Sequence, residues 1–211
     1  MSTIDDGVIK YDRSQFIRSS ALNLDEYESL EKWRKILYNI NLIGEYLPEK
    51  IGFGNLSQKM DYKAYCQSNC CQFVITATQT GHLKELNGLS YTRVLDYNLE
   101  KQKIKVMGPK EASSEALTHA AMYESNNAIN TVFHIHDKII WKGMIDADYD
   151  YTDEDIPYGT KEMADSVSKY TRHKNSGLIV MKGHEDGVIS YGKNSQEAGD
   201  LLLKVYNIFH R

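Results

Sequence analysis

Residues 113–136 open with Ser113-Ser114-Glu115 and close with the run Thr131-Val132-Phe133-His134-Ile135-His136. In the closing run two histidines alternate with apolar residues, which predicts a β-strand that carries both imidazoles on one face. Val132 is expected to share that face, whereas Phe133 and Ile135 are expected to project to the opposite face. Two imidazoles on one rigid face are a starting point for a metal site. The rest of the chain has to supply whatever completes such a site.

The composition suits one large domain of 211 residues that can bury a sizeable core. The 25 Lys+Arg and 29 Asp+Glu residues leave a net charge of -4, and no basic cluster is interleaved with aromatics. Nucleic acid is therefore not expected as a partner. No membrane is expected either, because no apolar run approaches the length of a membrane span and the polar N-terminus lacks a signal-peptide core.

Three cysteines lie close together in one segment, at Cys66, Cys70 and Cys71. They form no C-x-x-C pair and the chain has no second cysteine pair, so a cysteine metal site is disfavoured. Reduced, partly buried thiols of a cytoplasmic protein are the better interpretation.

Periodicity and turn residues predict one α/β domain over residues 25–211, preceded by an irregular extension over residues 1–24. Helices are expected at 25–42, 115–123, 161–174 and 195–209, and strands at 51–60, 72–77, 91–97, 103–107, 131–136, 177–182 and 188–191. Residues 142–160 are expected to form a loop. The expected N-caps are Asp25, Ser113 or Ser114, and Ser195, and Gly44 is expected to end the first helix.

A third histidine, His184, follows the apolar strand at 177–182, where it can lean toward the face of His134 and His136. Three neutral imidazoles with an open fourth position are typical of catalytic Zn²⁺. Because none of these ligands is anionic, such a site keeps the full positive charge of the ion. That charge can polarise a carbonyl or stabilise an enediolate.

Each of these residues also has a purely structural interpretation. The histidines could be hydrogen-bonded core residues, since the pattern H-x-H is short and often accidental. Glu115 could be a first-turn acid favoured by the helix dipole, and Ser113 and Ser114 could be caps. His119, one turn after Glu115, could orient that carboxylate. Spacing alone leaves these alternatives open.

Five short motifs occur together in a defined order. They are Gly54-Asn55-Leu56-Ser57, Ile75-Thr76-Ala77-Thr78, Ser113-Ser114-Glu115-x-x-x-His119-x-x-x-Tyr123, His134-x-His136 and Gly183-His184. In this order they resemble the class II aldolase/adducin family, over roughly residues 25–211. Glutamate after the serine pair resembles the fuculose-phosphate aldolase-like branch, whereas related epimerases have aspartate there. The resemblance implies a three-layer α/β/α domain with a central, largely antiparallel mixed sheet.

The resemblance also implies a role for each matching residue. The implied ligands of a divalent ion, usually zinc, are His134, His136 and His184, and Glu115 is the implied general base and acid beside it. The implied holders of a substrate phosphate are Asn55, Thr78, Ser113 and Ser114.

The implied activity is aldol-type cleavage or formation of a C–C bond in a small sugar phosphate or related hydroxy-ketone. The implied assembly is a homotetramer. Epimerisation, dehydration or decarboxylation at the same metal site stays open as an alternative, as does a non-catalytic adducin-like role in protein interaction.

Departures from the family pattern bear on the substrate. Gln79 follows Thr78 where many relatives have glycine, and the next such pair is Thr80-Gly81. Either the anion-binding loop is shifted by two residues, or the pocket prefers a group other than phosphate. After His184, Glu185 and Asp186 come before the next glycine and are expected to be solvated.

Some aldolase relatives close the site with a tyrosine on a C-terminal tail, and no such tail is expected here. A tyrosine of the 142–160 segment could serve as proton donor instead, namely Tyr149, Tyr151 or Tyr158. No motif singles one out, so an interface or surface position is expected for each of them.

Overall fold

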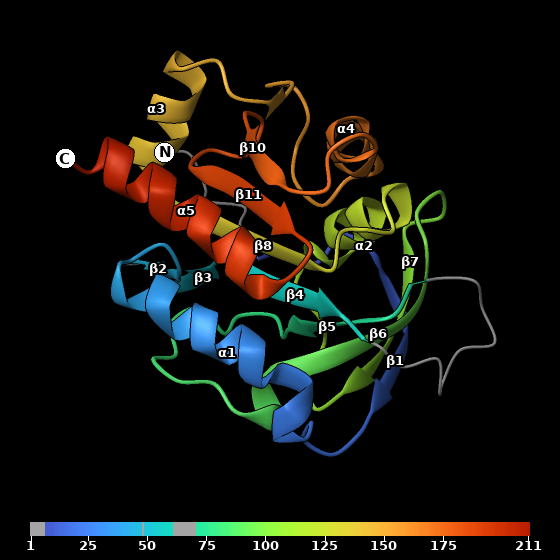
Figure 1. Ribbon diagram of the computed structural model, residues 1–211. Helices are drawn as coiled ribbons and strands as arrows, with labels where there is room; N and C mark the ends of the chain where they lie inside the picture. Colours follow the sequence, from blue (N-terminus) through green and yellow to red (C-terminus); the bar gives the residue numbers. More distant parts are fainter. Residues whose placement is uncertain (1–6, 48, 61–70) are drawn as a thin grey trace.

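The computed structural model describes residues 7–47, 49–60 and 71–211. Within this part of the chain, a nine-stranded sheet runs in the order β1-β7-β6-β5-β4-β8-β11-β10-β9 (Figure 1). The two outermost pairs, β1 with β7 and β10 with β9, are parallel. The inner neighbours are all antiparallel. The predicted α/β fold with a central, largely antiparallel mixed sheet is confirmed.

The strands of this sheet are β1 (Asp12–Arg18), β4 (Asn55–Lys59), β5 (Phe73–Thr76), β6 (Tyr91–Asn98), β7 (Lys103–Gly108), β8 (Thr131–His136), β9 (Tyr151–Thr152), β10 (Gly177–Met181) and β11 (Gly187–Gly192). A separate two-stranded hairpin is formed by β2 (Gly44–Tyr46) and β3 (Ile51–Phe53). The short 3-10 helix η1 (Gly88–Ser90) leads into β6.

Helices cover both faces of the sheet and complete the three layers (Figure 1). One face is covered by α1 (Leu24–Asn39), α3 (Lys138–Asp146) and α5 (Ser195–Phe209), the other by α2 (Ala116–Ser125) and α4 (Lys161–Thr171). Each interface between a layer of helices and the sheet has its own apolar core. Both faces of the central strands are therefore buried.

Strand β8 shows why this arrangement suits the sequence. Its six residues are all buried, because β4 and β11 flank it and helices lie above and below. Val132 packs into the core beneath α2 and α4, whereas Phe133 and Ile135 pack into the core beneath α1, α3 and α5. The predicted alternation is confirmed, and it directs His134 and His136 to the Val132 face.

The N-terminal segment differs from the sequence expectation. Residues 12–18 were expected to be irregular, yet they form the edge strand β1, paired in parallel with β7. Its side chains are mostly exposed, so the strand carries little apolar alternation for a sequence pattern to reveal. Backbone pairing with β7 and the packing of Phe16 against the core hold this strand in the sheet.

The expected loop at 142–160 is wrong in its first part. Helix α3 begins at Lys138, directly after β8, and buries Ile140 and Met144, one helical turn apart. Asp137 caps it, since its Oδ1 accepts a hydrogen bond of 2.8 Å from the Ile140 backbone N–H. The short strand β9 follows, and the loop proper is the segment between β9 and α4.

The residues that begin and end the helices differ by a few positions from those expected. Asn23 rather than Asp25 caps α1, and Asn194 rather than Ser195 caps α5. Helix α1 ends at Asn39, well before Gly44. The chain turns away from the helix at Asn41, which has a left-handed φ of 60°. The N-cap of α2 is Glu115, which makes no side-chain capping bond, so the expected serine cap is wrong.

Two further expectations concern single segments. The expected strand at 51–60 is divided by Gly54, whose φ of 81° turns the chain from β3 into β4. Cys71 is half-buried, whereas Cys66 and Cys70 lie outside the described residues. Among the described helices, none is long and apolar enough to cross a membrane.

Candidate metal centre

Three histidines converge at one end of the central strands. His134 and His136 project from β8, and His184 comes from the turn between β10 and β11. All three are buried, and one ligand atom of each lies within 4.8 Å of the others. The predicted third ligand is therefore brought to the other two. Antiparallel pairing achieves this, because Gly187, just after the turn, is aligned with His136.

Burial keeps the imidazoles of His134 and His136 neutral. The pKa of His134 lies well below its usual range, first because it is buried and then because of His136, His184 and His119 nearby. The pKa of His136 is lowered well below its usual range by burial and by the proximity of His184. Neutral rings offer a nitrogen lone pair at physiological pH, which is the form that a metal ion binds.

The residues present fit a divalent ion of the zinc type. The donor set consists of three imidazoles, and the buried Nε2 of His134 has no hydrogen-bond partner among the described residues. A buried nitrogen without a partner is costly unless something binds it. The histidine cluster is thus compatible with a metal site.

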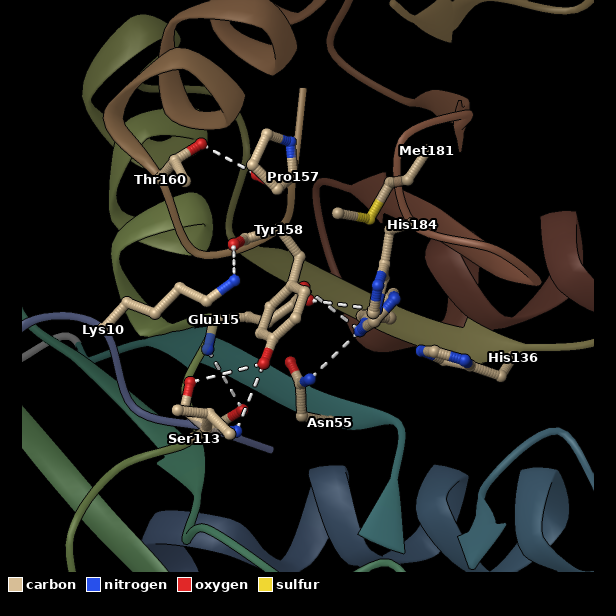
Figure 2. A network of polar contacts seen from close by, with 12 residues as sticks. Lys10, Asn55, Ser113, Glu115, His136, Pro157, Tyr158, Thr160, Met181 and His184 are labelled. Carbon is tan, nitrogen blue, oxygen red and sulfur yellow. Dashed lines mark hydrogen bonds and ion pairs between the residues drawn. The ribbon is translucent and has the colours of Figure 1, made fainter. Parts of the chain in front are cut away.

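Glu115 lies against two of the histidines, although it comes from the start of α2 (Figure 2). Its carboxylate oxygens are 3.1 Å from His134 Nδ1 and 3.4 Å from His184 Nε2. Asn55, at the start of β4, places its Nδ2 3.1 Å from the same His134 Nδ1. Both side chains are buried, so this acid sits inside the site rather than on an exposed first turn.

All eight site residues expected from the sequence line one cavity of about 30 Å³. They are Asn55, Thr78, Ser113, Ser114, Glu115, His134, His136 and His184. A volume of this size holds one or two water molecules. The expected residues are thus assembled around one cavity.

The loop that contains Gln79, where many relatives have glycine, keeps the backbone conformation that glycine favours. Gln79 has a left-handed φ of 55°, the conformation that glycine adopts most readily. Thr78 and Gln79 both line the cavity, and so do Thr80 and Gly81. The Thr80 hydroxyl donates to Ala77 O, and Gln79 Oε1 accepts from Gly52 N–H at 2.9 Å. The loop therefore stays in place, with a carboxamide added at its rim.

Tyr158 is the site residue that sequence motifs did not single out. It is buried and lines the cavity, with its ring centroid 4.6 Å from that of His184. The expected surface position is therefore wrong for Tyr158. Gly183 permits the approach, since a Cβ there would lie 2.0 Å from Ile156 O. Tyr149 and Tyr151 pack instead against the other core.

The N-terminal segment reaches the rim of the same cavity. Gly7 lines it, and the Val8 backbone N–H donates to the Tyr158 hydroxyl at 3.2 Å. Lys10 Nζ donates to Tyr158 O at 3.2 Å and lies 3.8 Å from the centre of its ring (Figure 2). Residues 7–10 are called the strap below. The sequence held no signal for it, because none of its contacts is periodic.

His119 has a different partner from the one expected. Its Nδ1 lies 2.6 Å from Ser57 Oγ, which lies 2.7 Å from the Tyr123 hydroxyl. All three are buried, and burial lowers the pKa of His119 to about 3. This chain of hydrogen bonds ties α2 to β4 beneath the site.

The two acids after His184 do not line the described cavity wall. Glu185 is exposed and pairs with Lys138, as expected for a solvated turn. Asp186 is half-buried in a left-handed turn with a φ of 67°. Burial raises the pKa of Asp186, with a further contribution from Glu185.

Solved structures share this fold at low sequence identity. L-fuculose-1-phosphate aldolase from Thermus thermophilus is 17% identical with a TM-score of 0.61, covering 88% of this chain and 91% of that one. YgbL from Klebsiella pneumoniae, a candidate aldolase/epimerase/decarboxylase, is 16% identical with a TM-score of 0.65, covering 88% and 87%. A sugar-phosphate aldolase from Thermotoga maritima is 15% identical with a TM-score of 0.62, covering 88% and 92%.

Sequence comparison gives the family directly. A search of curated protein sequences found no match. The family model described as "Class II Aldolase and Adducin N-terminal domain" matches residues 49–210, which include all eight expected site residues. The chain belongs to the class II aldolase and adducin family.

Proposed function

We propose that this protein is a metal-dependent lyase that cleaves or forms a C–C bond in a small sugar phosphate or related hydroxy-ketone. The observation that carries the proposal is the position of Glu115, a buried carboxylate within 3.4 Å of ring nitrogens of two clustered histidines. A proton carrier beside three neutral metal ligands is the arrangement that aldol chemistry requires.

The three histidines would hold the ion. Zinc suits them because it accepts three imidazoles and leaves a fourth position open. When bound, the ion would polarise the substrate carbonyl and offset the negative charge of an enediolate. Because a neutral imidazole carries no negative charge, these ligands would leave the charge of the ion undiminished.

Glu115 would move the protons. In the cleavage direction its carboxylate takes the proton of the substrate hydroxyl, the C–C bond breaks, and an aldehyde leaves. The bonding electrons stay on the other fragment as an enediolate, which a protonated group then converts to the hydroxy-ketone. Tyr158, on the wall beside His184, is placed to supply that proton.

The remaining four residues would hold the anionic end of the substrate. Ser113, Ser114 and Thr78 offer hydroxyl groups to the cavity, and Asn55 offers an amide. The strap lies beside this group of residues, because Gly7 lines the same cavity.

A second reaction on the same site is epimerisation or decarboxylation, which the likeness to YgbL favours. It would use the same enediolate-stabilising residues and differ in the bond that breaks. A non-catalytic adducin-like role is disfavoured, because three histidines and an acid are kept buried together.

The test is product analysis of zinc-loaded protein on a panel of ketose phosphates and their unphosphorylated analogues. An aldehyde product with the wild type, reduced roughly 10²–10⁴-fold in Glu115→Gln, is expected. Glu185→Gln, which removes an exposed carboxylate near the site, is the matched control. Undiminished turnover in Glu115→Gln would refute the role of Glu115. An inverted or decarboxylated product would select the second reaction.

The homotetramer and the cytoplasmic location stay predictions from the sequence. Light scattering at working concentration tests the first, and a monomeric mass would contradict it.

A further inference from the structure

Tyr46 contacts one of the three histidines from outside the main sheet. It lies at the end of β2, in the small hairpin with β3, and its hydroxyl is 2.6 Å from His136 Nδ1. Tyr46 precedes residues 49–210, the part of the chain that matches the family. Tyr46 therefore lies outside the matched range and outside the five motifs.

The same segment holds His136 at two points. The backbone N–H of His136 donates to Leu42 O at 3.1 Å, and Tyr46, four residues further on, reaches the ring. Phe53, across the hairpin, packs against both rings, with centroids 4.7 Å from Tyr46 and 5.4 Å from His136. Such packing leaves the phenol little freedom to turn away from the imidazole.

The hydrogen bond bears on which nitrogen can bind an ion. A neutral imidazole carries one N–H and one lone pair, so its two nitrogens have opposite roles. If Nδ1–H donates to the Tyr46 oxygen, the lone pair is on Nε2 and can be given to a metal. If the phenol donates to Nδ1 instead, Nε2 carries the proton and cannot bind.

We propose that Tyr46 is a positioning residue for the metal site, which accepts the Nδ1–H of His136 and so presents Nε2 to the ion. The proposal rests on the proposed function to the extent that it requires an ion at the three histidines. Partners of this kind fix the tautomer and the ring orientation of metal ligands. A phenol does so without adding a negative charge, so the ion keeps its strength as a Lewis acid.

The first experiment is Tyr46→Phe, which keeps the ring and removes the hydroxyl. Zn²⁺ affinity is measured by competition with a chromogenic chelator, and Co²⁺ replaces zinc for visible absorption spectra. The expected result is a dissociation constant about 10–100-fold higher and an altered Co²⁺ spectrum. The matched control is Tyr38→Phe, which removes a phenol hydroxyl whose contact is a 3.4 Å bond to His82 O.

A second measurement avoids mutation altogether. Long-range ¹H–¹⁵N NMR of the zinc-loaded wild type reports the tautomer of each histidine, and His136 is expected to carry its proton on Nδ1. A bare Nδ1 would overturn the proposal, and so would wild-type affinity and an unchanged Co²⁺ spectrum in Tyr46→Phe. Wild-type protein that binds no zinc would overturn the proposed function as well as the role of Tyr46. The other two outcomes would overturn the role of Tyr46 alone, so the two failures can be told apart.

Discussion

His119 offers a quantitative test of how deeply the hydrogen-bonded chain of His119, Ser57 and Tyr123 is buried. Burial lowers its pKa from 6.5 to about 3, so folding must leave this imidazole neutral. Between those two pH values the unfolded chain binds a proton that the folded chain does not. The stability that this histidine contributes is therefore present above pH 6.5 and is lost as the pH falls toward 3.

The size of the effect follows from the pKa difference. Each pH unit in that range costs about 1.4 kcal/mol of unfolding free energy, or about 5 kcal/mol over the whole range. The perturbation is His119→Asn, which replaces the titrating ring by a neutral amide that can still bond Ser57. The slope of stability against pH should become smaller by about 1.4 kcal/mol per unit below about pH 6.

Urea denaturation of metal-free protein at four pH values between about 7.5 and about 4.5 measures this slope. The variant itself can be less stable at every pH without affecting the comparison, because only the change of slope is tested. His82→Asn, which removes an exposed imidazole, is the matched control. An unchanged slope in His119→Asn would show that His119 takes up its proton in the folded protein, and that the burial argument is wrong.

Three further predictions concern the cavity and its rim. Zinc at about 100 times its dissociation constant should add about 2.7 kcal/mol to the free energy of unfolding and raise Tm by roughly 5–10 °C, as measured by calorimetry. His136→Gln should abolish this gain. Gln79→Gly relieves a left-handed side chain and frees the Gly52 N–H, so inorganic phosphate should bind more tightly in titration calorimetry; weaker binding would contradict this. Lys10→Met removes an ammonium from the Tyr158 ring and carbonyl, and should speed hydrogen exchange at the Val8 amide about 10-fold. Unchanged exchange would mean that Lys10 does not hold the strap.

Local patterns predicted most elements because burial makes them periodic. Strands β6, β7, β8, β10 and β11 were expected within a residue or two, since alternation or apolar runs mark strands in a buried sheet. The edge strand β1 and the helix α3 were missed for opposite reasons. Most of β1 is exposed, so its sequence shows no apolar alternation. Helix α3 begins directly after β8, and its second half falls within residues 142–160, whose composition predicted a loop.

The candidate site divides in the same way. The His134-x-His136 pair could be read from the sequence, because residues two apart in a strand must share a face. The partners Tyr46 and Tyr158 could not, since the spacing along the chain does not record which distant segments touch. Tyr158 reaches His184 because Gly183 lets the backbone at Ile156 approach it. Tyr46 reaches His136 because the segment after α1 bonds to β8.

By itself, then, the sequence determined the family and the three-layer class, and it predicted which three histidines would cluster, since motifs and alternation are local properties. Only the tertiary structure decided that Glu115 lies beside two histidines, that Tyr158 and the strap residue Gly7 line the cavity, and that Tyr46 contacts His136. The physical reason is that contacts between distant segments depend on packing, strand register and close approach at glycines. None of these produces a periodic pattern in the sequence.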